Sequence, residues 1–144
     1  MIQKISSLTI VFLIAFALQL GIAMAAANFQ VISFSCDSEN VIGSTFSCIA
    51  TIQNKGDVAG TLSTATLYPD SSNWLESSNY PQSYGQAVNP SNSISVVFSN
   101  LRAVKTGNNG FSKIMLDSVI DTYVADNNKK VNVINVMVTI SNSA

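Results

Sequence analysis

The chain has 144 residues, the size of one ordinary domain, with 7 basic and 8 acidic side chains and a net charge of -1. A charge this close to zero excludes the strong electrostatic field that attracts nucleic acid or an anionic membrane surface. Histidine is absent, which removes the most common general base and metal ligand and counts against an enzyme.

Residues 1–27 form an N-terminal segment unlike the rest of the chain. Lys4 is followed by the apolar run LTIVFLIAFALQLGIAMAAA, whose end fits the A-x-A rule for leader removal at residues 23–25 and again at 25–27. We therefore predict a secretory signal peptide. A retained hydrophobic anchor helix is the alternative, because about 20 apolar residues can cross a bilayer. In both cases residues 28–144 are expected outside the cytoplasm, secreted or held at the cell surface.

Two predicted strands begin this exported domain, and each carries one cysteine. The signal is strict alternation of apolar and polar residues, seen in FQVISFSC (29–36) and in STFSCIATIQN (44–54). The apolar parity contains Ile32, Phe34 and Cys36 in the first strand and Phe46, Cys48, Ala50 and Ile52 in the second. Both cysteines are therefore expected on the core-facing side.

A disulfide between Cys36 and Cys48 is predicted from this placement. Antiparallel pairing of the two strands brings the cysteines together, and an exported domain meets an oxidising compartment. The bridge would close a loop of about a dozen residues and add roughly 3 kcal/mol of stability in the chain-entropy model. Two cysteines without histidine cannot complete a structural zinc site.

Turn residues and further alternating runs predict the remaining strands. Turns are expected at NKGD (54–57), where Asn54 and Gly56 are typical turn formers, and at GNNG (107–110), which is typical of a hairpin loop. The predicted strands are TLSTATLY (61–68), a short one at 82–88, SISVVFSNL (93–101), SKIMLDSVIDTYVAD (112–126) and VNVINVMVTI (131–140).

Two of these runs carry further expectations. The run 112–126 is also compatible with a helix. In the run 131–140, Ile134, Val136, Val138 and Ile140 are expected to face one way. The total of about seven strands predicts an all-β, antiparallel, two-sheet immunoglobulin-like β-sandwich after the N-terminal helix.

Three segments resemble the CARDB family, an immunoglobulin-like, cell-adhesion-related domain of bacteria and archaea. FSCIATIQNKGDVAGT (46–61) resembles its second strand and N-x-G turn, VNPSNSISVVFSNL (88–101) its proline-led strand, and VIDTYVADNNKKVNVINVMVTI (119–140) its last turn and strand. Ser91 and Asn92 stand where the family usually has a glycine after the proline. The resemblance implies an extracellular module linked to adhesion, scaffolding or surface presentation.

No catalytic, cofactor or metal site is predicted. The carboxylates are scattered among turns, none follows the ligand spacing of a calcium loop, and no serine has a histidine partner. The chain is expected to work by surface contact and without a cofactor.

Trp74, Tyr80 and Tyr84 form the predicted contact group. They lie in the polar stretch 69–90, where aromatic rings could stack on sugars or bind a protein. The alternative is that Trp74 plugs one end of the sandwich, with its indole N–H bonded locally. The expected partner is thus a protein or a cell-surface glycan, not nucleic acid, with membrane contact only through the N-terminal segment.

A second hypothesis makes the chain a pilin-like subunit that self-assembles into filaments. A retained apolar N-terminal helix would pack into the fibre core, although the prepilin cleavage mark is poorly met because Lys4 is followed by Ile5 before Ser6. A variant of this hypothesis uses strand exchange by the apolar, nearly uncharged strand 131–140, since such a strand pairs readily with an exposed edge. Ordinary burial of that strand is the alternative.

Overall fold

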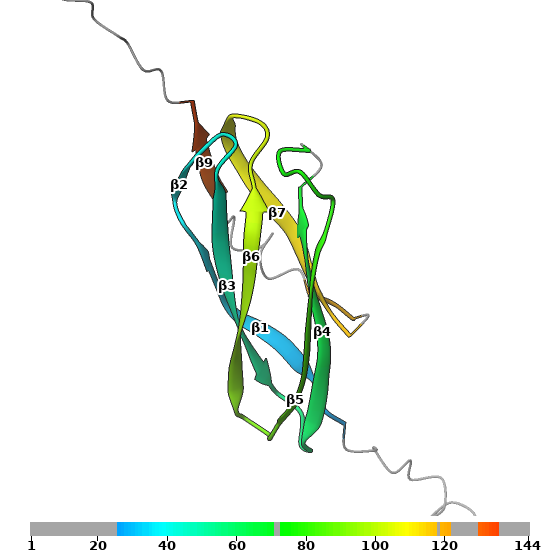
Figure 1. Ribbon diagram of the computed structural model, residues 1–144. Coiled ribbons are helices and arrows are strands. Elements are labelled where there is room, and N and C mark those ends of the chain that lie inside the picture. Colours follow the sequence, from blue (N-terminus) through cyan, green and yellow to red (C-terminus); the bar gives the residue numbers. More distant parts are fainter. Residues whose placement is uncertain (1–25, 71–72, 118, 122–129, 136–144) are drawn as a thin grey trace, which may run out of the picture.

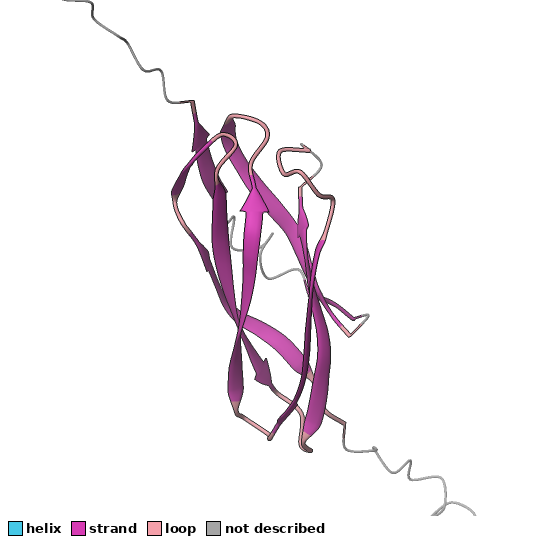
Figure 2. Ribbon diagram, in the orientation of Figure 1, coloured by secondary structure: helices cyan, strands magenta, loops and turns pink. Residues whose placement is uncertain are grey.

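The computed structural model describes residues 26–70, 73–117, 119–121 and 130–135. Every regular element in these ranges is a strand, as Figure 2 shows. These residues contain no helix long and apolar enough to span a bilayer. The strands are β1 (Phe29–Cys36), β2 (Glu39–Val41), β3 (Thr45–Asn54), β4 (Gly60–Pro69), β5 (Tyr80–Val88), β6 (Ser93–Arg102), β7 (Gly107–Leu116), β8 (Val119–Asp121) and β9 (Lys130–Ile134). The all-β class is confirmed, whereas the predicted N-terminal helix falls outside the described residues.

The strands form two sheets that pack face to face (Figure 1). One has three strands in the order β1-β3-β6, and the other has six, in the order β2-β9-β7-β4-β5 with β8 also paired to β7. The described chain thus has nine strands where about seven were predicted. The additional β2 and β8 span three residues each, too few for alternation to be recognised in the sequence. The β2–β9 pair is parallel, which the antiparallel prediction missed.

One contiguous core fills the space between the two sheets. Alternation places one face of each long strand in this core, because successive side chains point to opposite faces of a sheet. The largest fully buried apolar side chains are Trp74, Phe98, Ile52, Leu62, Leu67, Leu101, Ile114, Val96, Val131 and Val133.

The predicted disulfide joins β1 to β3. Cys36 lies directly opposite Cys48 in the antiparallel register, with an S–S bond of 2.03 Å and a Cα–Cα distance of 4.1 Å. The parity predicted for the start of β1 is wrong. A bulge shifts the register between Val31 and Ser33, so that Val31 is 4% exposed and Ile32 is 38% exposed.

Removing the disulfide is expected to cost about 3 kcal/mol of unfolding free energy, because the bond closes a loop across 12 positions. The Cys36→Ala/Cys48→Ala double variant should therefore unfold at clearly lower urea concentration in circular dichroism. The unmodified chain measured under reducing conditions is the control and should show the same loss. A midpoint unchanged in both samples would contradict a stabilising role.

The segment after β4 contains more strand than predicted. β5 begins at Tyr80 rather than near residue 82 and pairs with β4 from Leu67 back to Gly60. Pro81 and Gly85, whose φ is 63°, are tolerated because β5 is the edge strand of its sheet.

The hairpin loop predicted at residues 107–110 is wrong. These residues begin β7, where Gly107 pairs with Val133 and Gly110 with Lys130 of β9. The Gly110 carbonyl accepts the Trp74 indole N–H at 2.9 Å. Gly107 has a φ of 125°, a conformation that favours glycine, at the start of this strand.

The run 112–126 does not adopt the helical alternative in its described part. β7 continues to Leu116, and the chain reverses at Asp117, whose φ is 47°, into β8. The Asp117 carboxylate accepts the backbone N–H groups of Ser63 and Thr64 at 2.9 and 2.6 Å, where β4 carries a bulge. Asp117 thus holds the β7–β8 reversal against β4.

Asn54, predicted as a turn former, is instead a buried junction at one end of the sandwich. Its side chain is 0% exposed and uses all four of its hydrogen-bonding positions. Oδ1 accepts from the N–H groups of Asn28 (3.1 Å) and Gly56 (2.9 Å), and Nδ2 donates to the carbonyls of Val58 (2.8 Å) and Val88 (2.9 Å). One side chain therefore ties together the start of β1, the β3–β4 turn and the end of β5.

The β3–β4 turn also receives the first described residues of the chain. The Lys55 N–H donates to the Asn28 carbonyl at 2.7 Å. A Cβ at Gly56 would overlap the carbonyl oxygen of Ala26, so glycine is required here for close backbone approach. Residues 26–28 are thus part of the folded domain.

The β5–β6 turn contains a residue in a left-handed conformation. Pro90 and Ser91 occupy its centre, the Asn92 N–H donates to the Asn89 carbonyl at 3.1 Å, and Ser91 has a φ of 64°. This is the geometry of a type II turn, which favours glycine at the third position.

Ser91→Gly is therefore expected to raise the unfolding free energy by about 0.5–1 kcal/mol, since it relieves left-handed strain that exceeds the entropy cost of glycine. Urea unfolding checks the sign. Ser95→Gly in the extended strand β6 is the matched control and should destabilise by about 0.5–1 kcal/mol. Equal effects of Ser91→Gly and Ser95→Gly on the unfolding free energy would contradict the assignment of left-handed strain to Ser91.

Candidate binding surfaces

Trp74 of the predicted contact group is enclosed by the domain. Its side chain is 0% exposed, and its N–H is bonded to the Gly110 carbonyl. The indole stacks on Phe46, with ring centroids 5.8 Å apart, and meets Phe111 edge-on at 5.3 Å. A buried indole offers no surface to a partner, so Trp74 occupies the core position that the alternative described.

Tyr80 and Tyr84 are half-buried in β5 and pack against the core. The Tyr84 hydroxyl donates to the Ser95 carbonyl of β6 at 2.6 Å, and the Tyr80 hydroxyl accepts from the Ser77 N–H at 3.1 Å. Their polar ends therefore hold neighbouring chain segments. The structure does not bring the three aromatic residues together as one exposed surface.

The outer face of the three-stranded sheet forms a surface that we call the neutral face. It consists of two cross-strand rows, Ser33–Thr51–Ser95 and Ser35–Ile49–Val97. Ile49 and Val97 are 45% and 43% exposed, and the face has no charged member. Sequence analysis missed it as a site, although the signal was present in strand parities made of serine and threonine without charge.

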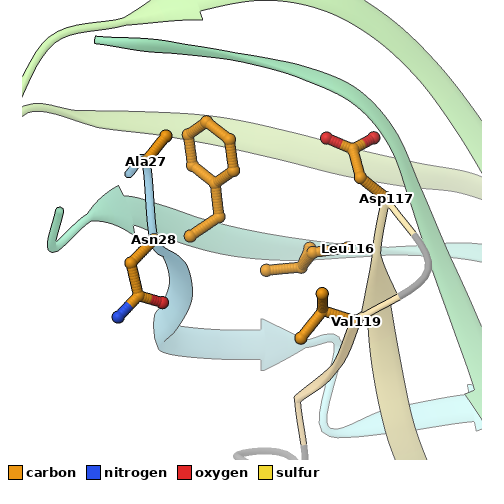
Figure 3. Close-up of a pocket in the computed structure, with 6 residues that line it drawn as sticks. Ala27, Asn28, Leu116, Asp117 and Val119 are labelled. Carbon is orange, nitrogen blue, oxygen red and sulfur yellow. The ribbon is translucent and has the colours of Figure 1, made fainter. Parts of the chain in front are cut away.

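A second surface feature is an apolar hollow beside the start of β1, with a volume of about 240 Å³. It is lined by Ala27, Asn28, Phe29, Leu116, Asp117 and Val119 (Figure 3). Because the Asp117 carboxylate is engaged by β4, the hollow offers mainly hydrocarbon.

The strand β8 borders this hollow and exposes the two most solvent-accessible large apolar side chains of the described residues. Val119 is 67% exposed and Ile120 is 55% exposed. Within the described ranges, β8 pairs with β7, and the Asp121 carboxylate at its end accepts the Val31 N–H of β1. The hollow and the exposed Val119 and Ile120 side chains together form an apolar surface.

Nothing in the described ranges resembles a metal centre, because no three cysteine or carboxylate side chains come together there. The carboxylates of Asp70, Asp117 and Asp121 bind backbone N–H groups. For example, Asp121 accepts the Val31 N–H at 2.8 Å, next to the β1 bulge.

The fold defines an immunoglobulin-like β-sandwich with a disulfide between neighbouring strands of one sheet. Among solved structures it is similar to the CARDB domain of the PF1109 protein from Pyrococcus furiosus, determined in complex with di-metal ions. The TM-score is 0.52 at 12% sequence identity, with 76% of this chain and 94% of that one covered. No family model and no curated protein matches the sequence. The similarity confirms a CARDB-like fold.

Proposed function

We propose that the chain is an exported, non-catalytic module that acts in adhesion or scaffolding at the cell surface. The neutral face is the observation that carries this proposal. The CARDB-like fold suggests a cell-adhesion-related domain, and the intramolecular disulfide is compatible with an oxidising, extracellular location.

The chemistry of the neutral face suits a neutral, hydroxyl-rich partner, which we take to be a cell-surface glycan. Serine and threonine hydroxyls both donate and accept hydrogen bonds, so they can match sugar hydroxyls. Ile49 and Val97, paired across β3 and β6, supply an apolar strip for the C–H side of a sugar ring. With no charge on the face, binding a neutral glycan requires no desolvation of an ion.

Single charge insertions test this role. Full-length chains carrying Ile49→Glu or Val97→Lys are compared with the unchanged chain for binding to immobilised neutral and acidic polysaccharides and to whole cells. Binding to a neutral polysaccharide should fall about tenfold or more, because the bound glycan would cover the inserted charge without offering it a partner of opposite charge. Gln86→Glu, at an exposed position of β5, is the matched control and should bind normally.

Other outcomes of that experiment are equally decisive. Equal binding by all variants would show that the neutral face is not the glycan-binding surface. Cell binding that survives removal of surface glycans, yet is lost in the face variants, would replace the glycan by a protein partner.

Intact mass of the native protein tests export. Loss of residues 1–25 or 1–27 is expected for a secreted module, and recovery of the complete chain from the membrane fraction would indicate an anchored one. An intact chain in the cytoplasmic fraction, with Cys36 and Cys48 reduced, would contradict the proposal.

A pilin-like filament subunit is the second candidate, favoured by one observation. The apolar N-terminal run leads into the domain without a linker, because Ala26 already packs on Gly56 and Asn28 is bonded to Asn54. A retained helix would then be rigidly joined to the sandwich. The same mass measurement decides, since loss of only about the first five or six residues is expected for this role, which retains the rest of the apolar run.

A further inference from the structure

The strand β1 joins the N-terminal end of the folded domain to the neutral face. It begins at Phe29, close to the first described residues, and ends at Cys36. Within the described residues it lies at the edge of its sheet, where it pairs with β3. Two of its residues, Ser33 and Ser35, belong to the neutral face. A pull between the N-terminal end and that face therefore acts on β1.

The direction of such a pull follows from the position of the row Ser35–Ile49–Val97. Ser35 lies near the far end of β1, about 20 Å along an extended strand from Phe29. Tension between the start of β1 and this row thus runs along the strand. Because the hydrogen bonds of an antiparallel pair are perpendicular to the strands, this tension acts on the β1–β3 bonds together and not one after another.

The disulfide fixes β1 at the end opposite to the one that is pulled. The Cys36–Cys48 pair directly follows the Ser35–Ile49 pair of the neutral face. A strand can slide along its neighbour only if its far end is free to move, and here that end is covalently bonded to β3. β1 can hardly lengthen either, since a strand at about 3.3 Å per residue is close to the maximum of about 3.6 Å.

The start of β1 is held by hydrogen bonds alone. The Asn28 N–H donates to Oδ1 of Asn54 at 3.1 Å, and the Lys55 N–H donates to the Asn28 carbonyl at 2.7 Å. These bonds can open under tension, whereas a covalent bond remains. The hydrogen bonds therefore position the start of the strand, and the disulfide secures its end.

The loop that the disulfide closes contains β2, which belongs to the other sheet. β2 pairs in parallel with β9, and backbone bonds of Ser38 and Ile42 with β9 extend this pairing at both ends. A pull that passes from Cys36 to Cys48 through the sulfur atoms bypasses residues 37–47. The contact between β2 and β9 is therefore not placed under tension.

The partner of β2 is fixed in the core. β9 buries Val131 and Val133, which are 1% and 2% exposed, and leaves Ile134 half-buried. The core parity expected for the run 131–140 is thus wrong in its described part, and 136–140 lies outside the described residues. Because β9 is held in the core, the closed loop with β2 connects the three-stranded sheet to the six-stranded one.

We propose that the domain bears tension between its N-terminal end and a partner bound at the neutral face, and that the Cys36–Cys48 bond keeps β1 in place under this tension. The tension-bearing role rests on the proposed adhesion role and deepens it. Without the bond, a pull draws β1 out of the sheet and removes Ser33 and Ser35 from the neutral face. With the bond, the face stays assembled until the whole domain unfolds.

Single-molecule stretching at constant force tests this role in the full chain, kept in mild detergent. Two azide-bearing amino acids carry the handles, one in place of the exposed Ala26 and one in place of Val97, which is 43% exposed. Coupling through azides leaves the bonded cysteines untouched. The measurement needs no glycan, so its failure and a failure of glycan binding are distinguishable.

The matched control moves the first handle from Ala26 to Thr61, an exposed residue of β4. A Cβ on the neighbouring Gly60 would meet the side chain of Ala27, so both handle positions lie beside the start of β1. The chain between residues 61 and 97, however, contains neither β1 nor the disulfide. The two handle pairs therefore differ in whether the tension passes through β1.

The unmodified chain should give a single extension, at whole-domain unfolding, with both handle pairs. The Cys36→Ala/Cys48→Ala chain should give an earlier partial extension with the 26–97 pair alone, because β1 is then free to slide. Its lifetime under force should shorten about tenfold more with the 26–97 pair than with the 61–97 pair, since forced unfolding follows the rate of the step that is pulled.

Two results would overturn the proposal. One is an early partial extension of the unmodified chain with the 26–97 pair. The other is an equal shortening of the lifetime for both handle pairs when the disulfide is absent. If the double variant does not fold, dithiothreitol added to the folded, unmodified chain supplies the same comparison. Neither result bears on glycan binding, which Ile49→Glu tests separately.

Discussion

Replacing Asn54 with leucine is expected to lower the unfolding free energy by roughly 4 kcal/mol, because four backbone groups lose their partner at once. Leucine has a similar volume but leaves the N–H groups of Asn28 and Gly56 and the carbonyls of Val58 and Val88 unsatisfied. Only the bond to Val88 is fully buried, so water can compensate part of the loss elsewhere. A domain of this size has a total stability of about 5–15 kcal/mol, so the variant should be close to unfolding at ambient temperature.

Urea unfolding followed by tryptophan fluorescence measures this effect, since the chain has one tryptophan and it is buried. Asn108→Leu, at an exposed position of β7, is the matched control and should change stability by less than about 0.5 kcal/mol. A loss in Asn54→Leu no larger than that of the control would contradict the junction role.

Truncating Trp74 to alanine is expected to cost about 3–5 kcal/mol, the range for removing a large buried aromatic side chain. The change empties the space between Phe46 and Phe111 and leaves the Gly110 carbonyl without its indole donor. Since this variant lacks the fluorescent reporter, unfolding is followed by far-ultraviolet circular dichroism.

Trp74→Phe separates packing from the hydrogen bond. Phenylalanine retains an aromatic ring beside its two neighbours but cannot donate to Gly110, so a loss of about 1–3 kcal/mol is expected. If Trp74→Ala were as stable as the unchanged chain, the indole would not be a core residue, and the predicted contact role would regain support.

Much of the fold could be read from local alternation. Period-two patterns located the long strands, and the matching apolar parity of Cys36 and Cys48 predicted their bond, because a strand points alternate side chains to opposite faces. The two three-residue strands escaped detection, since a pattern that short has no measurable period. The GNNG segment was misassigned because a glycine with positive φ, such as Gly107, occurs at a strand end as well as in a turn.

The candidate sites were harder to predict. Aromatic residues in a polar stretch suggested exposure for Trp74, Tyr80 and Tyr84, but Trp74 is buried and both tyrosine hydroxyls are bound to the backbone. The neutral face and the apolar hollow each combine residues distant in sequence. Their members become neighbours only when β3 pairs with β1 and β6, and when β8 approaches the start of β1.

The sequence by itself determined an all-β domain, its long strands and the disulfide, because these depend on the order of apolar and polar residues within a few positions. The tertiary structure alone decided that Val31 replaces Ile32 in the core, that β9 buries Val131 and Val133, and that Asn54 is enclosed. The physical reason is that alternation shows only which residues share a face. Which face is buried, and which polar group finds four partners, depends on how the two sheets and their connecting turns pack.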